Sequence, residues 1–336
     1  MAAKGARTGL PYWAVAGGFG ALLALGIAVA VVIYFRLIRY ERVAAQHVPR
    51  DAAFVVRLDV EQAIVYEPFR RHLLPLADRG RAPANAGAAR VLEPRLERVK
   101  RHTGIELAVD MRELLFARGP TEREWLLVIA GKFPKQGVVK GLHTVLHEEG
   151  VQAELLPGEQ SLELPSGSVL GQAEDGALLF ASGRAWLDGA LPSRAIPLEL
   201  GLNVGQAAAL AATSRGLALL PAVWSIFDPA LTAELQVQQL SGELALAAVP
   251  TLRARVRLAP GASAAAAEAR LRDWTRGARM ASAEQTPSSG KPRAVKGLEV
   301  SRGGEAELRI EGPWPRENLD GALESFGLWL VKSVAP

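Results

Sequence analysis

Residues 113–133 read ELLFARGPTEREWLLVIAGKF, two apolar runs on either side of Gly119-Pro120. Both runs are rich in aromatic and aliphatic residues, so they predict strands over 113–118 and 124–133 that are joined by a turn. This hairpin is the strongest indication of the fold, and the neighbouring segments extend it in both directions.

The segments around the hairpin predict more strands than helices. A strand is expected over 53–59, with helical composition over 60–79 and 89–102. After the hairpin, Pro134 begins a predicted helix through Glu149, and strands follow near 151–156, 161–164 and 168–173. Asp175-Gly176 is a two-residue hairpin signal that leads into a strand over 177–182 and a helix over 184–191. Because the strands cluster in hairpins, the predicted fold class is α+β, an antiparallel sheet with helices on one face.

The second half of the chain repeats this order of elements. It predicts a strand over 197–203, a helix over 205–227, a meander over 232–239, 243–248 and 251–258, a helix over 263–280, a hairpin around Gly303-Gly304 and a helix over 316–334. LDVEQA at 58–63 matches LNVGQA at 202–207, and LDGAL occurs at both 187–191 and 319–323. We therefore predict a duplicated body with repeats over 51–192 and 193–336. A single irregular α+β domain is the alternative.

The N-terminal region predicts a membrane helix. Residues 11–35 carry no charged side chain and are long enough to cross a bilayer. They follow a short tail, 1–10, and precede a predicted stalk, 36–50. Small residues at every fourth position (16, 20, 24 and 28) indicate that this helix could self-associate. A buried helix and a cleaved signal peptide are the alternatives.

The net charge of +4 belongs to the N-terminal region rather than to the body. Residues 1–42 contain five basic residues and one acidic residue, so the other 294 residues have no net charge. Basic residues are nearly equal in number on the two sides of residues 11–35, so the charge gives little information on orientation. Long domains are exported largely regardless of charge, which favours a single-pass inner-membrane protein with a periplasmic body.

Few residues indicate chemistry. With no cysteine, disulfides and thiolate sites are excluded. His143 and His147 stand four apart on the predicted 134–149 helix, a spacing that can share a metal, but they lie on its polar face and are interpreted as solvated. No pattern predicts a catalytic, cofactor-binding or metal-binding residue, and no cofactor is expected.

A local basic zone lies between Thr251 and Arg279. Three arginines alternate along the predicted 251–258 strand, and three more form a row on the next helix. An anionic partner is one interpretation. A solvated surface with ion pairs such as Glu268 with Arg272 is preferred, and nucleic acid is not expected, because Trp274 is the sole aromatic nearby.

Residues 48–191 resemble a loose group of bacterial single-pass envelope proteins of unknown function. The resemblance rests on Val48-Pro49-Arg50-Asp51-Ala52 before the first strand, Thr103-Gly104-Ile105-Glu106, Gly131-Lys132-Phe133 and Asp175-Gly176; Glu106 stands where that group has Asp. It implies an exported, membrane-tethered α+β domain and supplies no ligand.

Together these observations predict a membrane-anchored, non-enzymatic envelope protein with a binding or scaffold role. Its expected partners are the membrane, through residues 11–35, and either an envelope protein or a second copy through the same helix. A module for a lipid or another apolar ligand and a hydrolase with an unrecognised site are the alternative functions.

Overall fold

The computed structural model describes residues 40–67, 95–121, 123–191, 202, 205–219, 229–273 and 297–314. Contacts divide the chain into two units, residues 1–41 and 42–336. The second unit, called the body below, contains all of the strands and helices described here.

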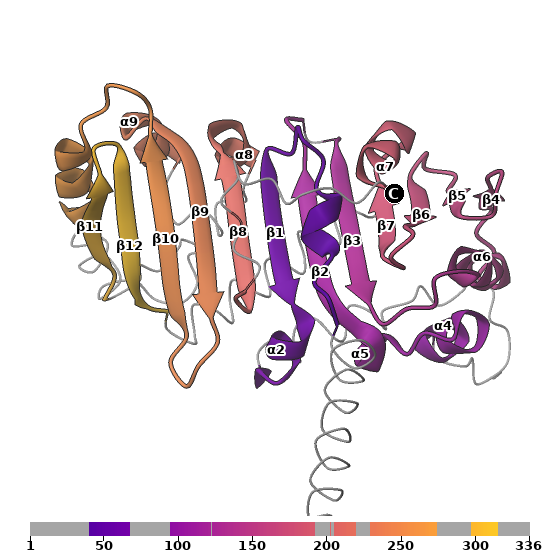
Figure 1. The fold of residues 1–336 in the computed structure, drawn as a ribbon. Helices are drawn as coiled ribbons and strands as arrows, with labels where there is room; N and C mark the ends of the chain where they lie inside the picture. Colours follow the sequence, from indigo (N-terminus) through magenta and orange to yellow (C-terminus); the bar gives the residue numbers. More distant parts are fainter. Residues whose placement is uncertain are drawn as a thin grey trace, which may run out of the picture. The chain divides into compact units, whose positions relative to one another are not determined.

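The body is built on one antiparallel sheet of twelve strands (Figure 1). The strands are β1 (Phe54–Asp59), β2 (Met111–Arg118), β3 (Trp125–Gly131), β4 (Glu154–Leu155), β5 (Ser161–Glu163), β6 (Val169–Gln172), β7 (Leu178–Ala181), β8 (Ala208–Thr213), β9 (Val237–Ala245), β10 (Thr251–Leu258), β11 (Glu299–Gly304) and β12 (Glu307–Pro313). Their order across the sheet is β11-β12-β10-β9-β8-β1-β2-β3-β7-β6-β5-β4. The predicted hairpins are confirmed, since β2–β3, β6–β7 and β11–β12 are all antiparallel neighbours.

The two halves of the chain meet at the centre of this sheet. β1 pairs with β8, from Phe54 opposite Ala212 to Leu58 opposite Ala208. Outward from that contact, β1, β2, β3, β7 and β6 follow on one side, and β8, β9, β10, β12 and β11 follow on the other. The same order of strands therefore runs in both directions, although the LDVEQA match is out of register, because residues 58–59 end β1 whereas Leu202 precedes β8. A common origin for the halves stays a prediction.

The predicted fold class is wrong in two respects. A body of two separate sheet-and-helix repeats was expected, but the main-chain hydrogen bonds between β1 and β8 merge all the strands into one large sheet with few helices. In the described residues, no helix has the length and apolar character needed to cross a membrane. The predicted transmembrane helix over 11–35 falls outside those residues, so the structure shows no N-terminal membrane helix and gives no support to a single-pass membrane assignment.

The helices are short and lie mainly between strands. They are η2 (Ala44–His47), α2 (Val60–Ile64), α4 (Arg95–Thr103), α5 (Leu107–Asp110), α6 (Val138–Glu148), α7 (Arg184–Ala190), α8 (Ser214–Leu219), α9 (Pro229–Glu234) and the helical residues 264–273. The predicted helices over 134–149 and 184–191 are confirmed as α6 and α7. The predicted strand over 232–239 is wrong at its start, because α9 continues to Glu234.

The helix predicted over 205–227 is wrong in its first part, because residues 208–213 form β8 and the helix α8 begins only at Ser214. The sequence AALAAT has helix-forming composition, but both edges of β8 are hydrogen-bonded, to β1 and to β9. Its alanines are nearly all buried, with Ala211 and Ala212 at 0% exposure. Pairing on both edges and burial on both faces override the local helix propensity.

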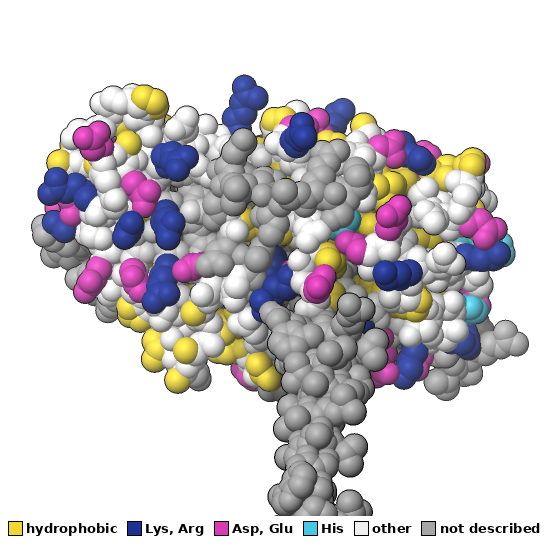
Figure 2. Space-filling view, viewed as in Figure 1, with side chains coloured by type: hydrophobic (Ala, Val, Ile, Leu, Met, Phe, Trp, Pro, Cys, Tyr) yellow, Lys and Arg dark blue, Asp and Glu magenta, His cyan; other side chains and the backbone are white. Residues whose placement is uncertain are grey.

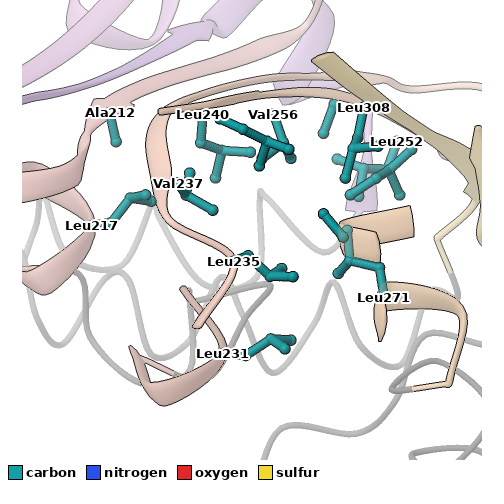
Figure 3. Close-up of a cluster of buried hydrophobic side chains, with 14 of the residues drawn as sticks. Ala212, Leu217, Leu231, Leu235, Val237, Leu240, Leu252, Val256, Leu271 and Leu308 are labelled. Carbon is teal, nitrogen blue, oxygen red and sulfur yellow. The ribbon is translucent and has the colours of Figure 1, made fainter. Parts of the chain in front are cut away.

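The two faces of the sheet are covered differently. The core face carries alternate residues such as Phe54 and Val56, and the helices α8, α9 and 264–273 pack leucines onto it (Figure 3). The opposite face carries Val55 and Arg57. In the first half of the chain, η2 and α7 pack on this opposite face, over β2, β3, β6 and β7. In the second half, the opposite face of β10 is exposed.

Candidate functional site

The first candidate site lies where the chain enters the body. Residues 42–47, called the strap below, include η2, which packs across β2 and β3 on the opposite face of the sheet (Figure 1). Ala44, Ala45 and His47 are all buried. The strap is short and has little apolar surface of its own, so polar contacts with the sheet must hold it in place.

A buried ion pair lies on the sheet beside the strap. Arg57 from β1 is 0% exposed and Glu113 from β2 is 1% exposed. The register places Arg57 opposite Leu115, so Glu113 is its diagonal neighbour on the same face. Arg57 Nε donates to Glu113 Oε1 at 2.6 Å, and Arg57 Nη1 donates to the carbonyl of Gln206 at 3.2 Å. The pair therefore links β1, β2 and the chain just before β8.

The carboxylates of this cluster also bind the strap. The backbone amides of Val43 and Ala44 both donate to Glu113 Oε2, at 2.8 and 3.2 Å. Arg42 donates from Nη2 to Asp59 Oδ2 at 2.8 Å. Asp59 Oδ1 accepts from the amide of Gln62 at 3.1 Å and so caps α2. Charges buried in the sheet thus anchor the N-terminal end of the strap.

His47 anchors the other end of the strap. Its side chain is 0% exposed. The ring atom Nδ1 lies 2.7 Å from the carbonyl oxygen of Ala190, the last residue of α7, and Nε2 lies 2.9 Å from Asp175 Oδ2 in the β6–β7 turn. Both neighbours are acceptors, so both ring nitrogens donate when the imidazole is protonated.

Electrostatics favour that protonated state. Burial opposes the charge on His47, but the hydrogen bond to Asp175, the bond to Ala190 and the charge of Asp175 together raise its pKa above 6.5. Burial likewise opposes the charge on Asp175, yet the hydrogen bonds from His47 and from the amide of Ala177 lower its pKa below 3.8. The two directions agree, and both favour the charged pair.

The second candidate site is the exposed part of the opposite face over β9, β10, β12 and β11, called the charged face below. Along β10, Leu252, Ala254, Val256 and Leu258 are buried, and the three arginines between them are exposed. Figure 2 shows basic and acidic side chains interspersed over this part of the molecule. An antiparallel sheet commonly leaves one face in water, so charge arrangement rather than exposure makes this surface a candidate.

One row of residues across the charged face is mainly acidic. Arg253 lies opposite Glu243 on β9 and opposite Glu311 on β12, and Glu311 lies opposite Glu299 on β11. Arg253 Nε donates to Glu311 Oε1 at 2.7 Å. The row therefore contains three carboxylates and one guanidinium.

The next row along the strands is basic. Arg255 lies opposite Ser241 on one side and Arg309 on the other, and Arg309 lies opposite Ser301. Like charges directly across strands repel each other. Arg309 reaches Glu307 at 3.4 Å, but within the described parts of the chain Arg255 has no ion pair. A basic row thus stands beside an acidic row.

The two histidines that the sequence had singled out, His143 and His147, form no metal site with other described residues. His143 Nε2 lies 3.0 Å from the carbonyl oxygen of Ala153, and His147 is exposed. In the portion that the structure describes, no group of three or more His, Asp or Glu residues could hold a metal ion. The predicted pair of Glu268 with Arg272 is confirmed at 2.7 Å.

Sequence reasoning missed the strap and its partners. The one available signal was the charge on Arg57, Asp59 and Glu113 within runs predicted to be buried strands. His47 carried no comparable signal, because Asp175 is 128 residues away along the chain.

Comparisons with known proteins show a distant likeness in fold. No family model matches the chain, and no curated protein is similar to it. The structure resembles that of TP0453. Crystal form III of TP0453 matches with a TM-score of 0.51 and 9% sequence identity, over 85% of this chain and 99% of the TP0453 chain. Crystal form I of the same protein gives 0.48 at 10% identity, over 86% and 99% of the two chains. At this identity the likeness to crystal form III shows the fold alone, and no family is assigned.

Proposed function

We propose that the body is a binding or scaffold protein of the cell envelope, rather than an enzyme, and that it holds a partner protein on its charged face. The partner presents carboxylates to the row of Arg255 and Arg309 and basic groups to the neighbouring acidic row. Its surface is therefore the electrostatic complement of two adjacent rows.

The observation that supports this proposal is the cross-strand arrangement of charge. In the acidic row Arg253 is neutralised by its neighbours, whereas the adjacent Arg255 faces serine and another arginine. Opposite charges on adjacent rows determine the orientation of a partner, because a shift by one row places like charges in contact. Arginine in a planar, exposed setting is also well suited to paired hydrogen bonds with carboxylates.

The envelope location rests on the resemblance of residues 48–191 to envelope proteins and is tested separately. A reporter that is active on one side of the inner membrane is fused after Pro336. Activity outside the cytoplasm supports the location. Activity in the cytoplasm refutes it, and the partner would then have to be a cytoplasmic protein.

Binding is tested by cross-linking in the native host. A photo-reactive residue replaces Ser241, which lies beside Arg255 in the basic row. The charge-reversed variant Arg255→Glu with Arg309→Glu is compared with Arg270→Glu. Arg270 is a matched control, because it is an exposed arginine on the helical residues 264–273, away from the charged face, where it pairs with Glu234 at 2.7 Å.

We expect one cross-linked partner with the unmodified face and with Arg270→Glu, and loss of that partner with the double reversal. Equal cross-linking in all three backgrounds would show that the charged face does not bind it. Measurement of the purified double variant by circular dichroism verifies that it remains folded.

A further inference from the structure

The strap has two different kinds of anchor. At its N-terminal end, Asp59 and Glu113 bind Arg42 and two backbone amides. At its C-terminal end a buried imidazole contacts the β6–β7 turn and the end of α7 at once. That second anchor depends on one proton.

A neutral His47 ring cannot donate hydrogen bonds to both of its neighbouring acceptors. A neutral imidazole has one N–H group and one lone pair. If Nδ1 keeps the proton, the lone pair of Nε2 faces the carboxylate of Asp175. If Nε2 keeps it, the lone pair of Nδ1 faces the carbonyl oxygen of Ala190, 2.7 Å away. Either tautomer leaves two acceptors in contact in a buried position, which is unfavourable.

When His47 loses its proton, no other described charged group takes the place of the imidazolium. Asp175 is the carboxylate whose charge acts on His47. On α7, Arg184 and Asp188 pair with each other at 2.9 Å. On the side of the sheet, Glu113 is engaged by Arg57 and by the strap amides. The end of α7 contributes its carbonyl groups, which also favour a cation.

We propose that His47 is a proton-operated latch, which locks the strap onto the sheet while its ring is charged and releases it when the ring loses its proton to solvent. The strap begins at residue 42, the first residue of the body, and His47 is its last residue. This device is independent of the charged face and goes beyond the proposed function.

The direction of the pH response follows from the contacts. The pKa of His47 is raised above its ordinary value of 6.5. The stabilisation from the latch is therefore fully present below pH 6.5 and is lost as the pH rises through the higher, folded-state pKa. Alkaline conditions loosen the strap, and acidic conditions close it.

The test is hydrogen–deuterium exchange of the full chain from about pH 5.5 to about 8.5, corrected for intrinsic rates. Peptides covering the strap are compared with peptides from β3, which report on the sheet as a whole. We expect corrected exchange in the strap to increase about tenfold across the transition, the scale expected for the loss of one buried hydrogen bond. Exchange in β3 should stay constant.

Three variants separate a latch from a merely structural histidine. Asp175→Asn removes the charge that favours imidazolium, so it should shift the transition to lower pH. His47→Gln should exchange at the same corrected rate at every pH. His102→Gln is the matched control, because His102 also contacts a carboxylate, Glu148 at 2.9 Å, and should leave the transition unchanged.

Two results would overturn the proposal. One is strap exchange in the unmodified chain that shows no pH transition after correction. The other is a transition that persists with the same midpoint in His47→Gln or in Asp175→Asn.

Discussion

Replacing Arg57 by leucine should destabilise the body more than any exposed arginine replacement. The substitution removes the guanidinium that donates to Glu113 at 2.6 Å and to the carbonyl of Gln206 at 3.2 Å. Glu113 is 1% exposed and keeps the amides of Val43 and Ala44 as hydrogen-bond donors. A buried carboxylate thus loses the guanidinium that donates to it.

The expected magnitude follows from that burial. Breaking a buried ion pair by removal of one partner costs about 3–5 kcal/mol, because the remaining charge has lost its water as well as its partner. A domain is stable by about 5–15 kcal/mol in total, so the loss is a large fraction. Adding Glu113→Gln removes the stranded charge and keeps an acceptor for the strap amides, so the double variant should recover about 0.5–3 kcal/mol through coupling.

The assay is urea unfolding of the full chain followed by tryptophan fluorescence, with Arg270→Leu as the control. Arg270 and Glu234 are each 51% exposed, so water screens their pair and its loss should leave the midpoint almost unchanged. Equal midpoints for Arg57→Leu and Arg270→Leu would refute the reasoning. Simple addition of the Arg57 and Glu113 effects would show that the two groups are not coupled.

Three further outcomes are expected. Gly216→Ala should lower stability, because a Cβ at this position would overlap the carbonyl oxygen of Ala53, just before β1. Gly189→Ala in α7 has open space and should raise the midpoint of thermal unfolding. Thermal unfolding of both variants decides whether the close approach of Gly216 to Ala53 matters. Burial opposes the charge on Glu149, but hydrogen bonds from two arginines of α4 outweigh this effect and lower the pKa of Glu149 below 4.5. The contribution of Glu149 to stability is therefore present above pH 4.5 and is lost as the pH falls through the folded-state pKa. Glu149→Gln should remove this loss of stability in acid, as measured by unfolding curves over a pH series. Leu271→Ala should cost about 2–5 kcal/mol in urea unfolding, because that side chain is 0% exposed in the core, and Val249→Ala, at 59% exposure, should leave the midpoint unchanged.

The hairpins could be predicted from the sequence because their information is local. The turn at Gly119-Pro120, the Asp175-Gly176 dipeptide and Gly303-Gly304 each lie between apolar runs of strand length. Pairing of such neighbours requires only the turn and a matching alternation of buried side chains. The same locality explains why α6 and α7 were predicted within a few residues.

The candidate sites were predicted unequally. The alternation of Arg253, Arg255 and Arg257 placed three charges on one face of a strand, and the structure confirms that placement. Arg253 pairs with a carboxylate, whereas among the described residues Arg255 has no ion pair; this difference depends on the register of β9 and β12, which no local pattern encodes. The membrane helix predicted over 11–35 rested on the composition of that segment alone, and no contact in the described structure supports it.

By itself, the sequence determined the hairpin strands and the zero net charge of residues 43–336, since hairpins depend on residues close together in the chain and net charge on composition alone. Tertiary structure alone decided that β1 and β8 join the halves into one sheet, that an alanine-rich segment becomes a strand, and that His47 meets Asp175. Those features arise from hydrogen bonds and burial between distant segments. Their free energy is gained only when the sheet has assembled, and it then outweighs local preference.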